Sequence, residues 1–359
     1  MAVLNTYRKY AKMKTLWVLL VLLPLLATTA AAQKIALPCE IPTIEVAADG
    51  SGVWIVCSRK WKEIKQAQAE GKLPPAANDS PTDLYWLDMA TKVPEKIASA
   101  NADIRVIASR AGSRGLVVMP QQSGSGHAVL YERKQRVKEL PVDASFLLWS
   151  GDSQRVYFYG GSTLQADGWN ILGIYDLNSG TSKRVNLQEP TEILSVCQAT
   201  GGVYSATPSY PGFAGSTIEY TDRIQFVRRI HGWIGARFSA RCAYVASESD
   251  FHGPLPWAIY DTTNARKLFQ FTAADDEAKD DVYSLVGWNP THESMLLREH
   301  VSKGHDAIVE IFDVQSGRVL QTLPRSDVVA WSADGDNILE TDGASLSWRS
   351  AKLSSPPTQ

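Results

Sequence analysis

Hydrophobic residues along this chain occur in short runs and alternations separated by small polar turns. Val53-Trp54-Ile55, Val156-Tyr157-Phe158 and Met295-Leu296-Leu297 are typical runs. They do not recur at the i, i+3, i+4 spacing of an amphipathic helix, whereas short apolar runs bounded by turn residues are typical of β-strands. The pattern therefore predicts an all-β chain, apart from a short polar helix within the insertion 59–83.

One unit of this pattern recurs. An apolar strand ends in a bulky residue, a polar turn follows, and a second apolar strand begins about seven residues later. Trp331-Ser332-Ala333-Asp334-Gly335 leads to Ile338-Leu339 in this way, and Trp149-Ser150-Gly151-Asp152-Ser153 leads to Val156-Tyr157-Phe158. The corresponding anchor positions are 46, about 109, 149, 197, 238, 288 and 331. Most are about 40 to 50 residues apart, which is the period of four-stranded propeller blades.

The repeat predicts a seven-bladed β-propeller with four-stranded antiparallel blades. Six or eight blades stay open as alternatives, because the copies near 109 and 197 are degenerate. Most units also contain a third strand that ends in a tight turn, such as Ile174-Tyr175-Asp176 before Asn178-Ser179-Gly180. Asn and Gly tolerate the positive φ that such turns require.

The W-S-x-D-G turn and the later Y-D-x-x-S/T-G hairpin resemble the repeats of TolB-type, WD-repeat-like bacterial β-propellers. The resemblance covers residues from about 40 to 350. It implies the propeller fold without specifying a function, since such propellers serve as binding platforms, as partners in envelope complexes and as non-catalytic domains of peptidases.

The last unit contains only three predicted strands, at 328–331, 338–341 and 345–349. We expect Lys34-Ile35-Ala36-Leu37 to supply its fourth strand and so to close the ring. Closure of this kind leaves no long unpaired strand edge, which would otherwise favour aggregation.

Residues 1–32 have the features of a secretory signal peptide. Basic residues up to Lys14 precede an apolar run from Leu16 to Leu26, and Ala30-Ala31-Ala32 precedes Gln33. The run is too short to favour a transmembrane helix, although an uncleaved membrane anchor is the alternative. The predicted organisation is a signal peptide at 1–32, a propeller at 33–352 and a disordered tail at 353–359. It predicts a periplasmic or secreted protein with no transmembrane span after cleavage.

Charge excludes one large class of function. The chain has 36 Lys and Arg residues against 38 Asp and Glu residues, and loss of the four basic residues in 1–32 leaves 32 − 38 = −6. A nucleic-acid-binding protein needs clustered cations to displace phosphate counterions, so no nucleic-acid partner is expected.

Four cysteines allow three pairings. The repeat places Cys39 and Cys57 on neighbouring strands of the first blade, and Cys197 and Cys242 in equivalent turns of consecutive blades. We therefore predict the disulfides Cys39–Cys57 and Cys197–Cys242, with four buried thiols as the alternative. The chain has no C-x-x-C motif of thioredoxin or zinc-knuckle type.

Candidate functional residues gather in the connections between second and third strands, which the repeat places on one face of the ring. Loops on a rigid scaffold commonly carry function, and aromatic residues mixed with polar groups suit recognition of a protein or peptide. The candidate binding residues are His127, Trp169, Tyr210, Phe213, Asp250, Phe251, His252, His300, His305 and Asp306. We interpret the protein as a non-enzymatic binding platform for a protein or peptide, without a cofactor.

The sequence offers three catalytic or metal-binding alternatives. A lyase or glycosidase site at the channel mouth could use Asp250, His252 and Asp306. A metal site drawing on His300, His305 and Asp306 lacks the helical spacing of known zinc motifs. A serine hydrolase is not supported by sequence, because the chain contains no G-x-S-x-G motif.

Overall fold

The computed structural model describes residues 34–40, 42–70, 81–121, 124–142, 146–159, 171–188, 193–207, 216–231, 233–248, 257–271, 281–302, 307–323 and 327–351. The chain divides into two compact units, Met1–Lys34 and Ile35–Gln359. The predicted signal peptide and the predicted tail lie outside the described residues. No helix in the described ranges is long and apolar enough to cross a membrane.

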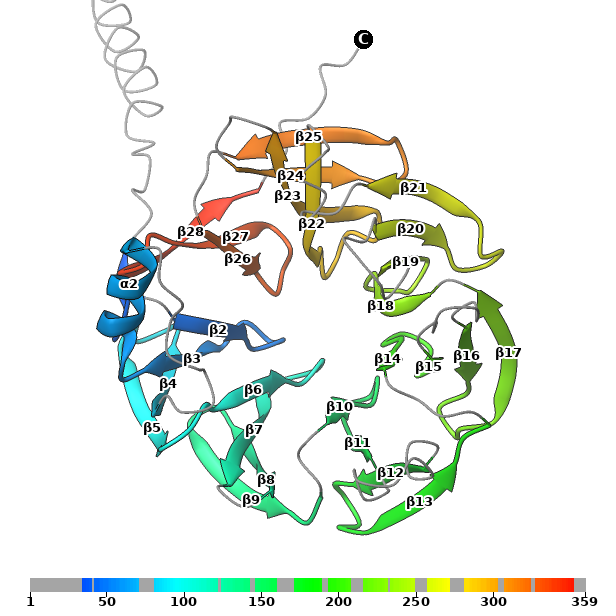
Figure 1. Ribbon diagram of the computed structural model, residues 1–359, viewed down its shortest axis with the longest axis horizontal. Helices are drawn as coiled ribbons and strands as arrows, with labels where there is room; N and C mark the ends of the chain where they lie inside the picture. Colours follow the sequence, from blue (N-terminus) through cyan, green and yellow to red (C-terminus); the bar gives the residue numbers. More distant parts are fainter. Residues whose placement is uncertain are drawn as a thin grey trace, which may run out of the picture. The chain divides into compact units, whose positions relative to one another are not determined.

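The unit Ile35–Gln359 is a seven-bladed β-propeller, and each blade is a four-stranded antiparallel sheet (Figure 1). Blade one comprises β2 (Pro42–Val46), β3 (Gly52–Ser58), β4 (Thr82–Asp88) and β5 (Pro94–Ala100). Blade two comprises β6 (Arg105–Ala108), β7 (Arg114–Gln121), β8 (Gly124–Glu132) and β9 (Gln135–Leu140). Blade three comprises β10 (Leu147–Trp149), β11 (Arg155–Tyr159), β12 (Ile171–Asp176) and β13 (Ser182–Asn186). The predicted short helix is α2 (Trp61–Ala69), between β3 and β4.

The remaining blades follow the same strand order. Blade four comprises β14 (Ile193–Val196), β15 (Val203–Thr207), β16 (Ser216–Tyr220) and β17 (Phe226–His231). Blade five comprises β18 (Ile234–Phe238), β19 (Tyr244–Glu248), β20 (Trp257–Asp261) and β21 (Lys267–Phe271). Blade six comprises β22 (Asp281–Trp288), β23 (Met295–Ser302), β24 (Ile308–Asp313) and β25 (Arg318–Leu323). Blade seven combines β26 (Asp327–Trp331), β27 (Asn337–Thr341) and β28 (Ser345–Ser350) with β1 (Ile35–Ala36). The count of seven removes the alternatives of six and eight.

The ring is closed by the N-terminal strand, as predicted. Ile35 pairs with Leu346 and Ala36 with Ser345, and the Leu37 N–H donates to the Ala344 carbonyl at 2.8 Å. The strand is two residues long rather than the four expected. Ile35 is only 4% exposed, so this short strand contributes to the core as well as to the ladder.

Burial explains why the middle strands read as continuous apolar runs. Third strands such as β12, β20 and β24 are almost wholly buried, because each blade packs against a neighbour on both faces. The outermost strands β9, β13 and β25 are mostly exposed. They carry cations such as Lys138, Arg184 and Arg318, and charge on an edge strand opposes pairing with another chain.

Tryptophans at the ends of the innermost strands tie consecutive blades together. The Trp149 indole Nε1–H donates to the Ile107 carbonyl of blade two at 2.9 Å. The Trp288 indole donates to the Arg237 carbonyl of blade five at 2.8 Å, and Trp331 repeats the contact with Gly287 of blade six. The bulky residue of the repeat thus fills the space between two blades and also satisfies a backbone acceptor.

The polar turn after each tryptophan is stabilised by its own side chains. The Ser150 hydroxyl donates to Asp152 and accepts the Arg155 N–H at 2.9 Å. The Ser332 hydroxyl makes the corresponding bonds with Asp334 and with the Asn337 N–H. The W-S-x-D-G pattern therefore encodes a turn rather than a ligand site.

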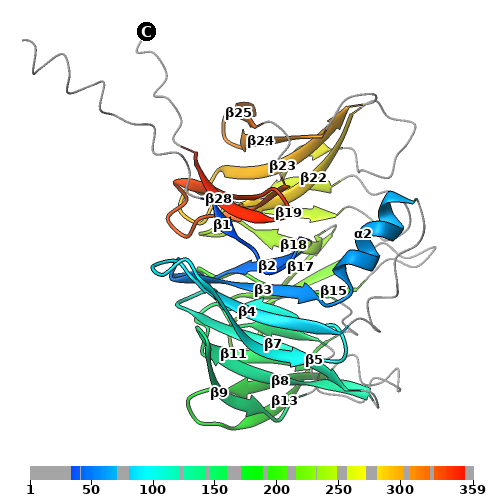
Figure 2. The same cartoon turned by 90° about the vertical axis from the view of Figure 1, so that its left-hand side faces the viewer.

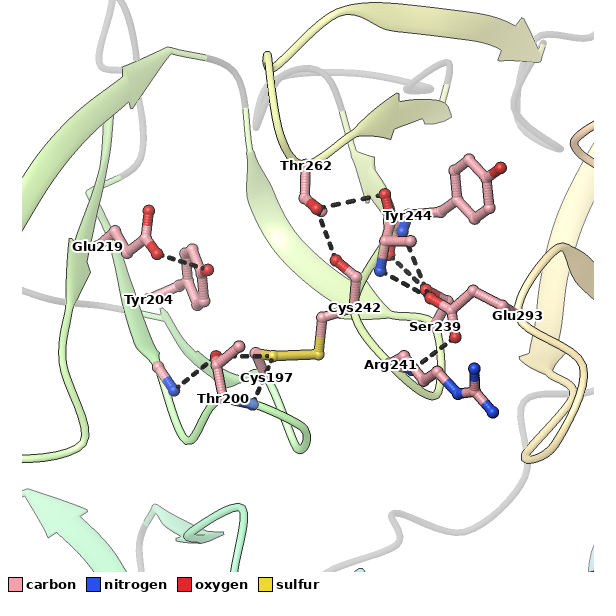
Figure 3. The surroundings of a disulfide bond; sticks show 12 residues. Cys197, Thr200, Tyr204, Glu219, Ser239, Arg241, Cys242, Tyr244, Thr262 and Glu293 are labelled. Atoms are coloured by element: carbon pink, nitrogen blue, oxygen red, sulfur yellow. Dashed lines mark hydrogen bonds between the residues drawn. A yellow bond between two sulfur atoms is a disulfide. The ribbon is translucent and has the colours of Figure 1, made fainter.

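Blade five has lost the acid of this turn, since Arg241 stands at the position of the aspartate. Glu293 in the equivalent turn of blade six supplies the missing carboxylate (Figure 3). It accepts hydrogen bonds from the Ser239 hydroxyl, from the Arg241 N–H at 2.5 Å and from the Ala243 N–H at 2.7 Å. The turn of one blade is thus completed by its neighbour.

Both predicted disulfides are present. Cys39–Cys57 joins the segment after β1 to the end of β3, and Cys197–Cys242 joins the first turns of blades four and five (Figure 3). The Cα–Cα distance is 5.9 Å in each. Two disulfides indicate an extracytoplasmic environment, because cytosolic thiols are kept reduced.

Replacing Cys197 and Cys242 together by alanine is expected to lower the free energy of unfolding by about 2–4 kcal/mol. The bond closes a loop with a sequence separation of 45, so its loss restores considerable freedom to the unfolded chain. Guanidinium denaturation of parent and double variant measures the change. An unchanged midpoint contradicts the prediction.

Candidate functional site

The two faces of the ring differ in how their connections are built. On one face, here called the turn face, first strands turn into second strands and third strands into fourth. The opposite face, here called the loop face, receives the connections between second and third strands. These include 59–81, 160–170, 208–215 and 249–256. Helix α2 projects from the loop face in Figure 2.

Several carboxylates on the turn face accept hydrogen bonds within the turns that carry them. Hydrogen bonds from Ser179 hold the pKa of Asp176 below its ordinary value, and the Thr263 hydroxyl does the same for Asp261. The Ser332 hydroxyl lowers the pKa of Asp334. These three carboxylates stabilise their turns by accepting hydrogen bonds from nearby N–H and hydroxyl groups.

A cluster of charged and aromatic residues lies in blade six. Arg298 on β23 faces Glu310 on β24, and the guanidinium Nε and Nη2 both lie 2.7 Å from the Glu310 Oε2. Their side chains are only 7% and 8% exposed. The guanidinium also lies over the rings of Phe312, Tyr283 and Phe271, at 4.2, 4.5 and 4.9 Å from the ring centroids. Ion pairing and cation–π contacts together offset the cost of burying this charge.

The cluster continues toward the loop face through His300 and Ser302. Alternate residues of a strand share one face, so Arg298, His300 and Ser302 follow each other along β23. The His300 Nδ1 lies 3.3 Å from the Glu310 Oε1, and the Ser302 Oγ lies 3.1 Å from the His300 Nε2. The Tyr283 ring stacks on the imidazole with centroids 4.4 Å apart. We call Arg298, Glu310, His300 and Ser302 the blade-six relay.

The order of groups fixes the direction of the hydrogen bonds. The Glu310 carboxylate, paired with Arg298, can only accept, so the His300 Nδ1 donates to it. In the neutral imidazole the Nε2 then accepts from the Ser302 hydroxyl. The relay can therefore receive a proton from Ser302 on His300.

The structure describes two of the predicted binding residues. His300 lies on β23 close to its loop-face end, and His127 lies on β8 opposite Met119. They belong to blades six and two. The other predicted residues, Trp169, Tyr210, Phe213, Asp250, Phe251, His252, His305 and Asp306, lie outside the described residues.

Sequence reasoning missed the partners of His300. The repeat places His300 in the connection after Met295-Leu296-Leu297, but β23 continues to Ser302. Arg298 and Ser302 therefore occupy alternate strand positions with His300, and this alternation of polar residues is a usable signal for a shared face. Glu310 could not be assigned from this pattern, because its place beside Arg298 depends on the register between β23 and β24. Within the described ranges, no three His, Cys, Asp or Glu side chains form a group that could hold a metal ion.

A second unusual group lies on an innermost strand. Burial raises the pKa of Glu45 on β2 to about 7, and the nearby positive charge of Arg110 opposes this shift. Arg110 follows β6 in blade two; the residue remains exposed, and desolvation by the surrounding protein lowers the pKa of its guanidinium. Its carbonyl accepts from the Gln198 side chain of blade four at 2.8 Å, so the first turns of these blades meet near the axis.

Replacing Glu45 with glutamine is expected to raise stability at pH 8 by about 1–2 kcal/mol and to leave it nearly unchanged at pH 4. The folded chain holds the Glu45 proton more tightly than the unfolded chain, whose carboxyl titrates near 4.5. The parent protein therefore loses the stability that protonated Glu45 contributes as the pH rises from about 4.5 through 7. Melting temperatures at pH 4, 6 and 8 test the difference. Equal pH profiles for parent and variant contradict it.

No protein-family model matches the chain, and no curated protein matches it. Solved structures do match. Hydrazine synthase of Kuenenia stuttgartiensis is 12% identical with a TM-score of 0.56, covering 92% of this chain and 99% of that one. An oligogalacturonate lyase in complex with manganese is also 12% identical, with a TM-score of 0.57 and coverage of 91% and 95%.

The β-propeller domain of the Trilobed protease from Pyrococcus furiosus is 10% identical, with a TM-score of 0.54 and coverage of 79% and 84%. Likeness at this level of identity shows the fold alone. The chain is therefore a seven-bladed β-propeller by structure as well as by repeat, and its likeness to the TolB-type family rests on the sequence motifs.

Proposed function

We propose that this protein is an extracytoplasmic binding platform that recognises a protein or peptide through its loop face. The difference between the two faces supports the proposal. On the turn face, Asp176 and Asp334 are hydrogen-bonded to their own turns and Glu293 to the neighbouring turn, whereas the longest connections between strands emerge on the loop face. Loops of this kind on a rigid scaffold are the usual carriers of recognition.

Side chains of blade six supply a recognition surface in this proposal. Tyr283 and His300 form a stacked pair that is partly exposed, and Ser302 adds a hydroxyl beside them. The buried Arg298–Glu310 pair holds the histidine in place from below. A preorganised aromatic and hydrogen-bonding surface loses little conformational entropy on binding. Trp169, Phe213 and Phe251, which the repeat assigns to loop-face connections, are further candidate contacts in the proposal.

Site-specific photo-crosslinking in living cells tests the binding face. The photoreactive residue p-benzoylphenylalanine replaces Trp169, Phe213 or Phe251 on the proposed loop face, and Asn178 or Gln315 on the turn face as matched controls. We expect one adduct of constant partner mass from the loop-face positions and none from the controls.

The partner captured in this way must then bind the purified parent directly, with weaker binding after Tyr283→Ala and unchanged binding after Asn178→Ala. Adducts from the turn-face positions alone contradict the proposed face. Absence of adducts at every position, with the variants exported and folded, contradicts a protein partner.

A further inference from the structure

The order of Ser302, His300 and Glu310 has a chemical consequence beyond binding. We propose that Ser302 is a nucleophile for acyl transfer from ester substrates, with His300 as its general base and Glu310 as the residue that positions His300. This inference does not depend on the protein partner proposed above. It rests on the connectivity hydroxyl, imidazole, carboxylate within one blade.

The distances between Ser302, His300 and Glu310 are compatible with proton transfer from the serine to the histidine. The Ser302 Oγ and the His300 Nε2 are 3.1 Å apart, within hydrogen-bond reach. The 3.3 Å between the His300 Nδ1 and the Glu310 Oε1 is a longer contact, also within hydrogen-bond reach. Because Glu310 accepts from Nδ1, the lone pair of Nε2 points at the serine hydroxyl.

Burial changes steadily along the relay. Arg298 and Glu310 are 7% and 8% exposed, and His300 is 17% exposed. Ser302, which ends β23 on the loop face, is half-buried. The charged end is thus shielded from water, while Ser302 is partly exposed. The Glu310 carboxylate beside Nδ1 stabilises the imidazolium that forms during the reaction.

The arrangement contains more than a buried ion pair. The Arg298–Glu310 pair is already enclosed by three aromatic rings and has its two closest bonds with each other. The His300 imidazole on the second carboxylate oxygen also stacks on Tyr283, but the Ser302 hydroxyl on its far nitrogen adds no apolar burial. These two groups add the elements that nucleophilic catalysis requires, namely a base oriented by a third group.

The reaction balances with water as the only co-reactant. The Ser302 Oγ bonds to the carbonyl carbon of the ester while its proton passes to the His300 Nε2. The bond to the leaving alcohol oxygen then breaks, and that oxygen takes the proton from the imidazolium. Water attacks the acyl-serine in the same way, giving its proton to Nε2, and the carboxylic acid departs as the Ser302 hydroxyl re-forms.

Two probes test the proposal with the purified chain. A fluorophosphonate reagent reports covalent capture of an activated serine, and p-nitrophenyl acetate reports turnover. We expect the fluorophosphonate to modify Ser302, identified by peptide mass spectrometry, and Ser302→Ala to remove both signals. His300→Gln leaves the Arg298–Glu310 pair intact and should slow labelling at least about 100-fold.

Matched controls separate catalysis from folding. His292→Gln and Ser316→Ala change the same residue types on the turn face of blade six and should label at the parent rate. Circular dichroism and thermal melting confirm that each variant is folded. Labelling that persists in Ser302→Ala, or that proceeds at the parent rate in folded His300→Gln, overturns the proposal, as does absence of labelling and turnover in the folded parent.

Discussion

Replacing Arg298 with methionine should lower the free energy of unfolding by about 3–5 kcal/mol, because it leaves the Glu310 carboxylate buried without its cation. The methionine side chain fills a similar volume among Phe271, Tyr283 and Phe312, so the change isolates the charge. Guanidinium denaturation of parent and variant gives the difference.

The double variant Arg298→Met with Glu310→Leu is the matched control. Removing both charges removes the unpaired group, and similar replacements of buried ion pairs are neutral or stabilising. We expect most of the lost stability to return in this variant. A double variant as unstable as Arg298→Met would show that the cost arises from packing rather than from an orphaned charge.

Deleting residues 33–38 should lower the free energy of unfolding by more than about 4 kcal/mol. The deletion removes the buried Ile35 side chain and the backbone bonds of β1 to β28. It also leaves Leu346 of β28 on an uncovered edge, which favours association between chains. Thermal melting and light scattering follow the two effects.

Removing six residues from the predicted tail, 353–358, is the control of equal length. This variant should melt with the parent. Ile35→Asp provides a second test, since it keeps the chain length and places a charge in the closing contact. If the 33–38 deletion melts at the parent temperature, the closure by β1 does not stabilise the ring.

Much of the fold could be predicted because its signals are local. Ser150 and Asp152 lie two residues apart and make the turn that their sequence pattern predicts. Trp149, Trp288 and Trp331 mark the inner strands because each one must reach the preceding blade. The disulfide Cys197–Cys242 followed from the same periodicity, since equivalent turns of consecutive blades are neighbours in a ring.

The site was less predictable because its contacts depend on strand register. His300 was singled out as a loop-face residue, but its bond to Glu310 requires the alignment of β23 with β24. The raised pKa of Glu45 likewise depends on burial near the axis, which outweighs the opposing charge of Arg110 from another blade. Neither contact leaves a fixed spacing in the sequence. The absence of G-x-S-x-G therefore excluded one setting for a reactive serine and not the strand setting of Ser302.

Because Glu293 of blade six completes the first turn of blade five, neither blade can be transferred to another propeller by itself without losing these hydrogen bonds. A blade-five module moved alone into another propeller would arrive with the Arg241 and Ala243 N–H groups lacking their acceptor. Blade six moved alone would leave the same defect behind. Blades five and six are thus the smallest portable unit in this part of the ring, and the bond from Cys242 to Cys197 extends that unit to blade four. Chimeras that cut between these blades should need an aspartate at position 241 to restore an independent turn.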